Sequence, residues 1–217
     1  MRKIFATAFL ALLLAGCSSD EEPARQDAID RSVIYGETLV FEAGGYVCDN
    51  HFVGELREGE NGAQTFVAAH IGECEIYNSS IANARYRITV EPEETVFPNL
   101  HMEIGMPYAE FVKAHFQYLR NPGNPIVANA TDDASDHIRY AYHFSDDRLA
   151  RIVVTFNVSD LGNGGEKKLD DFLTHRYEED AAAPGTWYNA YSPGDATVKA
   201  TLEGPDYRSI LTIESVR

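Results

Sequence analysis

The residues best suited to metal or hydrolytic chemistry lie in one acidic segment that contains Asp132, Asp133, Ser135, Asp136 and His137. Carboxylate oxygens are the ligands that Ca²⁺ prefers. However, the spacing does not match the calcium loop D-x-[DN]-x-[DN]-G, and the chain has no G-x-S-x-G, H-E-x-x-H or P-loop motif. We therefore interpret the segment as a solvated loop, and we predict no catalytic residue, no metal site and no cofactor.

Aromatic side chains supply the second candidate site. Trp187, Tyr188 and Tyr191 are close in sequence, and such rings stack on sugars or peptides when a surface exposes them. Packing in the core is the alternative, and it is common for aromatics at strand spacing. His115 and His143 also stand among aromatic residues, so we interpret them as packed side chains rather than bases. The three aromatics remain the candidate partner-binding surface.

The N-terminus carries a separate chemical signature. Arg2 and Lys3 precede an apolar run over 4–15, which is shorter than the roughly 20 residues that span a bilayer. The run ends in Leu14-Ala15-Gly16-Cys17, which resembles the lipobox of bacterial lipoproteins. This resemblance implies cleavage after Gly16 and a diacylglycerol thioether on Cys17, with a further acyl chain that makes the attachment lasting.

The residue after the lipidated cysteine indicates a destination. In the lipoprotein family an Asp at this position commonly retains the protein in the inner membrane, and here the residue is Ser18. The resemblance therefore implies an outer-membrane lipoprotein, and we expect its folded part to face the periplasm.

Two cysteines remain once Cys17 is assigned to lipid. Cys48 and Cys74 form an even pair in an exported chain, and such pairs are usually disulfides. We expect this bond to stabilise the fold by roughly 3 kcal/mol in the chain-entropy model. A metal or catalytic thiol site is the alternative, because His51 and His70 are near in sequence, but no CxxC spacing supports it.

The chain is strongly acidic. Arg2 and Lys3 leave with the signal peptide, so the mature chain keeps 16 basic residues against 34 acidic ones, a net charge of about −18. Nucleic acid and anionic lipid surfaces are therefore disfavoured as partners, and no basic cluster stands out to counter the overall charge. Basic proteins, cationic peptides and divalent metals are not disfavoured on this ground.

Changes in residue pattern divide the chain into four parts. A signal peptide over 1–16 and an acidic tether over 17–31 precede a β-rich unit over 32–95 and an α+β module over 96–217. The β-rich unit is expected to be a small antiparallel sheet clipped by the disulfide. Helical spacing predicts helices over 108–119 and 168–178. The module's expected strands cover 138–144, 151–158, 187–191, 197–202 and 209–213. The predicted fold class is α+β.

Residues 103–158 resemble the small α+β modules of the outer-membrane assembly lipoprotein family called SmpA/OmlA. The resemblance rests on Ile104-Gly105-Met106 before a helix with Glu110 and Phe111, and on Asp146-Asp147-Arg148-Leu149 before Ile152. It implies the fold alone and carries over no functional residue.

These observations favour a membrane-anchored, non-enzymatic binding or assembly factor of the cell envelope. Its expected partners are the membrane, through lipid on Cys17, and another envelope protein, a peptide or a glycan. A metal-dependent or hydrolytic enzyme is one alternative, which would be built on residues such as Ser135, Asp136 and His137. An acidic inhibitor of a basic enzyme such as a lysozyme is another.

Overall fold

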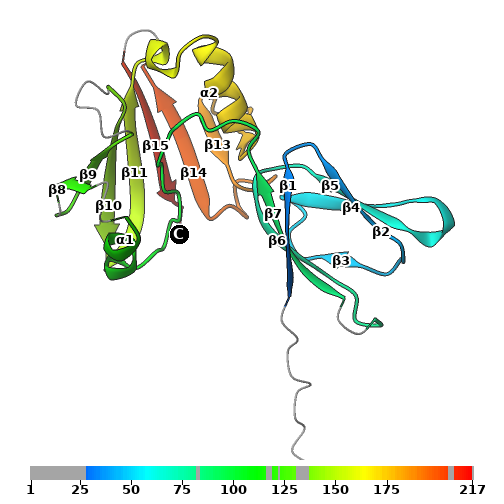
Figure 1. Cartoon of the computed structure of the whole chain (residues 1–217). Coiled ribbons are helices and arrows are strands. Elements are labelled where there is room, and N and C mark those ends of the chain that lie inside the picture. The colour runs from blue at the N-terminus through cyan, green and yellow to red at the C-terminus, as the bar shows by residue number, and fades with distance from the viewer. Residues whose placement is uncertain are drawn as a thin grey trace, which may run out of the picture.

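The computed structural model describes residues 28–81, 84–115, 119–121, 123–130, 137–204 and 208–216. The buried apolar residues of these segments form two clusters, one between residues 33 and 90 and the other between residues 97 and 213. We call the first body, residues 29–91, the β unit and the second, residues 97–215, the module (Figure 1). Mixed helices and mostly antiparallel strands confirm the predicted α+β class.

Two small sheets share the core of the β unit. The first has the order β1 (Ile29–Ile34), β7 (Arg85–Glu91), β6 (Gly72–Tyr77) and β3 (Val47–Cys48), and its β1–β7 pair is parallel. The second has the order β2 (Thr38–Phe41), β5 (Gln64–Ala68) and β4 (Gly54–Glu58). Alternate residues of β5 are buried, as expected of a strand with one face on a core. Phe66 lies at the centre of this core and is fully buried.

The predicted disulfide is corrected by the structure, in which Cys48 and Cys74 are both free and buried. Cys48 pairs with Ile76 across the β3–β6 ladder, so Cys74 is its diagonal neighbour rather than its direct one. Diagonal Cα atoms in such a ladder are roughly 7–8 Å apart, beyond the usual reach of a disulfide. The Cys48 thiol donates to the carbonyl oxygen of Asn50 at 3.4 Å. A hydrogen bond to Cys48, together with burial, raises the pKa of Cys74.

An antiparallel sheet of eight strands forms the body of the module. Its order is β12 (Glu178–Glu179), β13 (Thr186–Tyr188), β14 (Val198–Glu203), β15 (Ser209–Ser215), β11 (Arg148–Phe156), β10 (Arg139–Ser145), β9 (Ile126–Asn129) and β8 (Leu119–Asn121). Helices α1 (Tyr108–His115) and α2 (Gly165–Thr174) pack on one face of this sheet (Figure 1). Phe111 of α1 contacts Tyr142, and Phe172 of α2 reaches Phe156 through Phe97.

Short sequence motifs determine where the helix and the turn next to the β10–β11 hairpin begin. Pro107 precedes α1, a position that suits proline, and its carbonyl accepts the first helical hydrogen bond, from Phe111 at 2.9 Å. The turn between β10 and β11 lies between the expected strands 138–144 and 151–158, and its residues Asp146 and Asp147 both have positive φ, at 50° and 62°. Aspartate tolerates that conformation, and two such residues match the twist of a tight hairpin.

The β unit and the module meet at an aromatic joint. The ring of Tyr35 stacks on His175 at 3.8 Å, and the backbone N–H of Ile71 donates to the carbonyl of His175 at 2.7 Å. His70 stacks on Phe52 at 3.9 Å and donates through Nδ1 to the carbonyl of Phe52 at 2.7 Å. Burial lowers the pKa of His70, so its ring is neutral at neutral pH.

Candidate functional site

The three aromatics predicted to bind a partner do not form one surface. Trp187 is only 8% exposed and belongs to the core of the module, so its ring has no face for a ligand. Tyr188 is half-buried in β13. Tyr191 is exposed, but the edge of its ring packs on Phe52 and His70 at the joint. Strand alternation separates Trp187 from Tyr188, because successive side chains point to opposite faces of a sheet.

The acidic segment is described only at its end. Asp132, Asp133, Ser135 and Asp136 lie outside the described residues. His137 is exposed and lines a cavity of about 300 Å³ with Arg139 and Arg208, whose positive charges disfavour a metal ion. Within the segments that the structure describes, no three His, Cys, Asp or Glu side chains are grouped to hold a metal.

The histidines of the module occupy two different places. His115 stacks on His101 at a centroid distance of 3.3 Å and is buried, as predicted for a packed side chain. Burial, and in second place His115, lower the pKa of His101 to about 4. His143 lies apart from them on β10 and approaches Arg151. The fold therefore does not pair His115 with His143.

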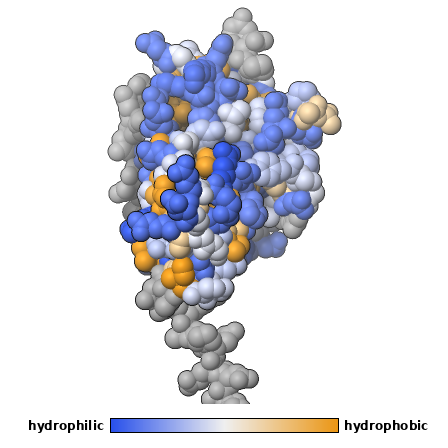
Figure 2. Space-filling model, turned by 90° about the vertical axis from the view of Figure 1, so that its right-hand side faces the viewer, coloured by the Kyte–Doolittle hydropathy of each residue, from blue (hydrophilic) through white to orange (hydrophobic). Residues whose placement is uncertain are grey.

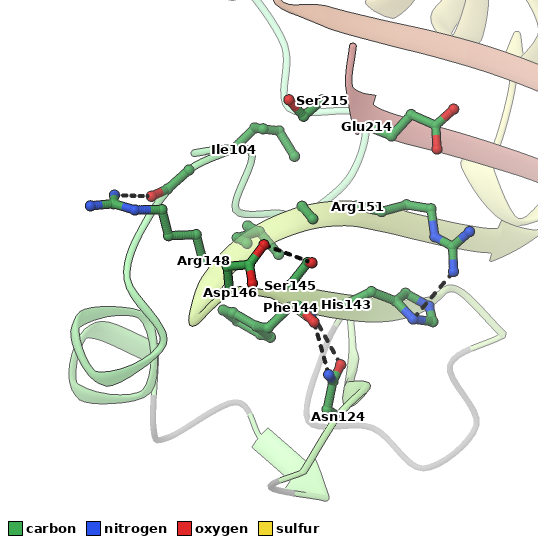
Figure 3. A pocket seen from close by; sticks show the side chains of 13 residues that line it. Ile104, Asn124, His143, Phe144, Ser145, Asp146, Arg148, Arg151, Glu214 and Ser215 are labelled. Carbon is green, nitrogen blue, oxygen red and sulfur yellow. Dashed lines mark hydrogen bonds between the residues drawn. The ribbon is translucent and has the colours of Figure 1, made fainter. Parts of the chain in front are cut away.

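A cavity of about 780 Å³ opens where the β10–β11 hairpin meets the loop at Ile104 and Gly105 (Figure 3). Phe144 and Leu149 supply apolar lining from the hairpin, and Ile104 supplies it from the loop. Arg148 and Arg151 extend toward opposite sides of the hairpin in this view. The two guanidinium groups therefore lie on opposite sides of the apolar walls that Ile104 and Phe144 supply.

A bulge in β11 determines the directions of the Arg148 and Arg151 side chains. The ladder pairs His143 with Arg151 but Phe144 with Leu149, so Ala150 is an extra residue on β11. Such a bulge redirects the side chains on either side of it. Leu149 turns into the core, whereas Arg151 stays exposed beside His143.

The neighbouring loop is tied to the start of β11 by hydrogen bonds. Gly105 donates to the carbonyl of Leu149 at 2.7 Å, and Leu149 donates to the carbonyl of Met106 at 2.9 Å. Arg148 donates through Nη1 to the carbonyl of Gly105 at 2.8 Å. Gly105 has φ +94°, which disfavours any residue with a side chain. These hydrogen bonds therefore fix the loop that forms one edge of the cavity.

The arginines retain unused hydrogen-bond donors. Arg151 donates to Nδ1 of His143 at 3.5 Å, which leaves the proton of that ring on Nε2. Burial, and secondly Arg151, lower the pKa of His143, so the imidazole is neutral at neutral pH. Glu214 at the edge of the cavity is paired with Lys199 at 2.9 Å. Among the described residues, neither Arg148 nor Arg151 forms an ion pair with a carboxylate.

This arrangement is suited to binding an anionic group. A guanidinium can hold a carboxylate through two parallel hydrogen bonds. The charge composition indicated no basic cluster, yet the fold places two arginines at one cavity in a very acidic chain. The available signal was the pair Arg148 and Arg151 around the short sequence Leu149-Ala150. The loop that completes the cavity could not be inferred from that pair.

Comparison with protein-family models gives one match, in which residues 1–18 match the prokaryotic membrane lipoprotein lipid attachment site. The chain is therefore a bacterial lipoprotein, anchored by covalent lipid to a membrane of the cell envelope. Neither the curated proteins nor the solved structures contain a match to the chain. The resemblance of residues 103–158 to SmpA/OmlA modules accordingly gains no support.

Cys17, the lipid-bearing residue, lies outside the described residues. No helix in the described part of the chain is both long enough and apolar enough to cross a membrane.

Proposed function

We propose that this lipoprotein is a non-enzymatic binding factor that holds another envelope protein by a carboxylate-bearing segment at the Arg148–Arg151 cavity. We place it at the outer membrane, facing the periplasm. Ser18 after the lipidated Cys17 supports this location, because the retention residue Asp is absent there.

The observation that carries the proposal is the pair of arginines without carboxylate partners among the described residues. In the described part of this acidic chain, six lysine and arginine side chains pair with carboxylates. Arg57, Arg85 and Arg87 all do so in the β unit. Arg148 and Arg151 instead contact a carbonyl and an imidazole, so their remaining N–H groups are available to a ligand.

The shape of the cavity favours a peptide segment over a free ion. Its volume of about 780 Å³ falls in the usual range of roughly 300–1,000 Å³ for ligand pockets. The apolar side chains of Ile104 and Phe144 would contact the body of a peptide, while the guanidinium groups hold its carboxylates.

Site-specific photo-cross-linking tests the proposal in intact cells. A photoreactive amino acid replaces Ser145, which is exposed and lines the cavity. We expect an adduct with a second protein that is lost when Arg148 and Arg151 are both changed to Gln. The matched control is Arg57→Gln, which removes an exposed arginine of the β unit and should leave the adduct intact.

An adduct that persists in the Arg148→Gln/Arg151→Gln protein, or the absence of any protein adduct, contradicts the proposal. An adduct with glycan instead of protein would show that the partner is a sugar. Circular dichroism of both variants shows whether the fold is retained, because these side chains are exposed and their loss should leave it unchanged.

A further inference from the structure

Four exposed hydrophobic side chains gather at one end of the four-stranded sheet in the β unit. Val47 and Tyr77 are direct neighbours in the β3–β6 ladder, and Ile29 begins β1 beside Tyr86. Ile81 lies in the turn between β6 and β7. Their exposed fractions run from 39% to 48%, which is high for such side chains. We call Ile29, Val47, Tyr77 and Ile81 the apolar rim.

The rim lies at the end of the β unit opposite the joint. β1 begins at Ile29 in the rim and runs to Ile34, next to Tyr35, which stacks on His175 of the module. β6 runs from Gly72, next to the joint residue Ile71, to Tyr77 in the rim. Six residues of strand extend roughly 20 Å. The β unit is thus a spacer with the module at one end and the apolar rim at the other.

A hollow of about 500 Å³ adjoins the rim, and Val40 and Ile81 are among its lining residues. Val40 is 67% exposed, the highest value among the large hydrophobic residues that the structure describes. Arg31, Tyr46 and Tyr86 also line this hollow. Tyrosine and arginine are suited to the boundary between water and lipid, because each has an apolar body and a polar end. Figure 2 shows apolar patches mainly in the lower half of this side of the molecule, where β1 begins in Figure 1.

The position of the lipid anchor identifies the occupant. Ile29 is twelve residues after Cys17, and a chain of that length reaches at most roughly 40 Å. The anchor therefore keeps the rim close to the bilayer at a high effective concentration. Of the charged side chains near the rim, Arg85 pairs with Glu75 and Arg87 pairs with Asp30, while Arg31 and Glu42 line the hollow.

We propose that the apolar rim docks on the lipid bilayer that holds the anchor, so that the β unit stands on the membrane and presents the module away from it. Covalent lipid supplies the attachment, and the rim sets the orientation. Burial of Val47 and Ile81 in the interfacial region removes apolar surface from water, which stabilises the docked state.

Quenching by labelled lipids tests this in the lipidated protein bound to phosphatidylcholine vesicles. A polarity-sensitive fluorophore is attached at Ile81→Cys in one sample and at Glu203→Cys, an exposed position of the module, in another. Cys48 and Cys74 are buried, so the introduced thiol is the accessible one among the described residues. We expect a blue shift and quenching by spin-labelled lipid at position 81 and neither effect at position 203.

A second variant controls for a fluorophore that inserts into the bilayer without docking of the protein. With the fluorophore at Tyr77→Cys, the changes Val47→Asp and Ile81→Asp should abolish quenching while the protein stays with the vesicles through its lipid. Equal quenching at positions 81 and 203, or quenching at position 77 that survives both aspartates, overturns the proposal. Neither result depends on the Arg148–Arg151 cavity.

Discussion

The β unit and the module differ in the kind of side chains that they leave exposed to solvent. Among the described residues, five of the seven exposed large hydrophobic side chains belong to the β unit, although it is the smaller body. The module covers one face of its sheet with two helices, and its other face carries polar side chains such as Thr201, Thr212 and Glu214. A small domain buries a smaller fraction of its surface, so some apolar exposure is expected of the β unit.

However, the location of the exposed side chains distinguishes the two bodies more than the number of exposed apolar residues does. Four exposed apolar residues of the β unit gather at the end where the anchored chain enters, whereas the module places Arg148 and Arg151 at the cavity proposed to bind a partner. Under the two proposals above, one body is adapted to lipid and the other to a polar partner. The aromatic joint connects the two bodies through Tyr35, Ile71 and His175.

The largest effect is expected from removing the centre of either core. Phe66→Ala in the β unit and Phe156→Ala in the module should each lower the free energy of unfolding by about 3–5 kcal/mol, through lost burial and the cavity left behind. Because the two buried clusters are separate, hydrogen exchange measured by mass spectrometry should rise mainly in residues 29–91 for the first variant and in residues 97–215 for the second. Equal acceleration in both regions would show that the joint makes them one cooperative unit.

An intermediate effect is expected from acid acting on the module. The pKa of His101 is about 4 when folded, against about 6.5 when unfolded, so the unfolded state binds the proton more readily. This contribution to stability is complete above pH 6.5 and is lost as the pH falls toward 4. Allowing for partial exposure of the ring, the loss is about 2 kcal/mol.

Urea unfolding at pH 7.5 and 4.5, followed by Trp187 fluorescence, measures this loss. The variant His101→Phe should weaken the dependence on pH, whereas His51→Gln, at an exposed position of the β unit, should keep it. If His101→Phe retains the full pH dependence, the assignment to His101 is wrong.

The smallest effect is expected at the best catalytic candidates of the sequence. Asp136→Ala/His137→Ala should leave complementation of a deletion strain unchanged, because His137 is exposed beside Arg139 and Arg208. Binding of a partner at the Arg148–Arg151 cavity would be unaffected. Loss of complementation by this variant, with the fold retained, would restore the enzyme hypothesis, and bound metal should then be measured.

Several elements were predictable because their signals are local. The lipobox is a continuous stretch that a peptidase recognises directly, and the β-rich character of residues 32–95 follows from short β-prone runs such as that of β2. The turn at Asp146 and Asp147 follows from the backbone preference of aspartate. β6 was missed, although Glu73, Cys74, Glu75 and Ile76 alternate between exposed or half-buried and buried positions. That alternation was a signal available in the sequence.

The sequence by itself determined the membrane anchor, the acidic charge and the α+β class, since each depends on composition or on neighbouring residues. Only the tertiary structure decided the strand register that places Cys48 opposite Ile76, and with it the absence of the expected bond. It also decided that Arg148 meets Gly105 across 43 positions of the chain and that Trp187 faces the core. Such pairings depend on how distant segments pack together, and one-dimensional spacing does not specify that packing.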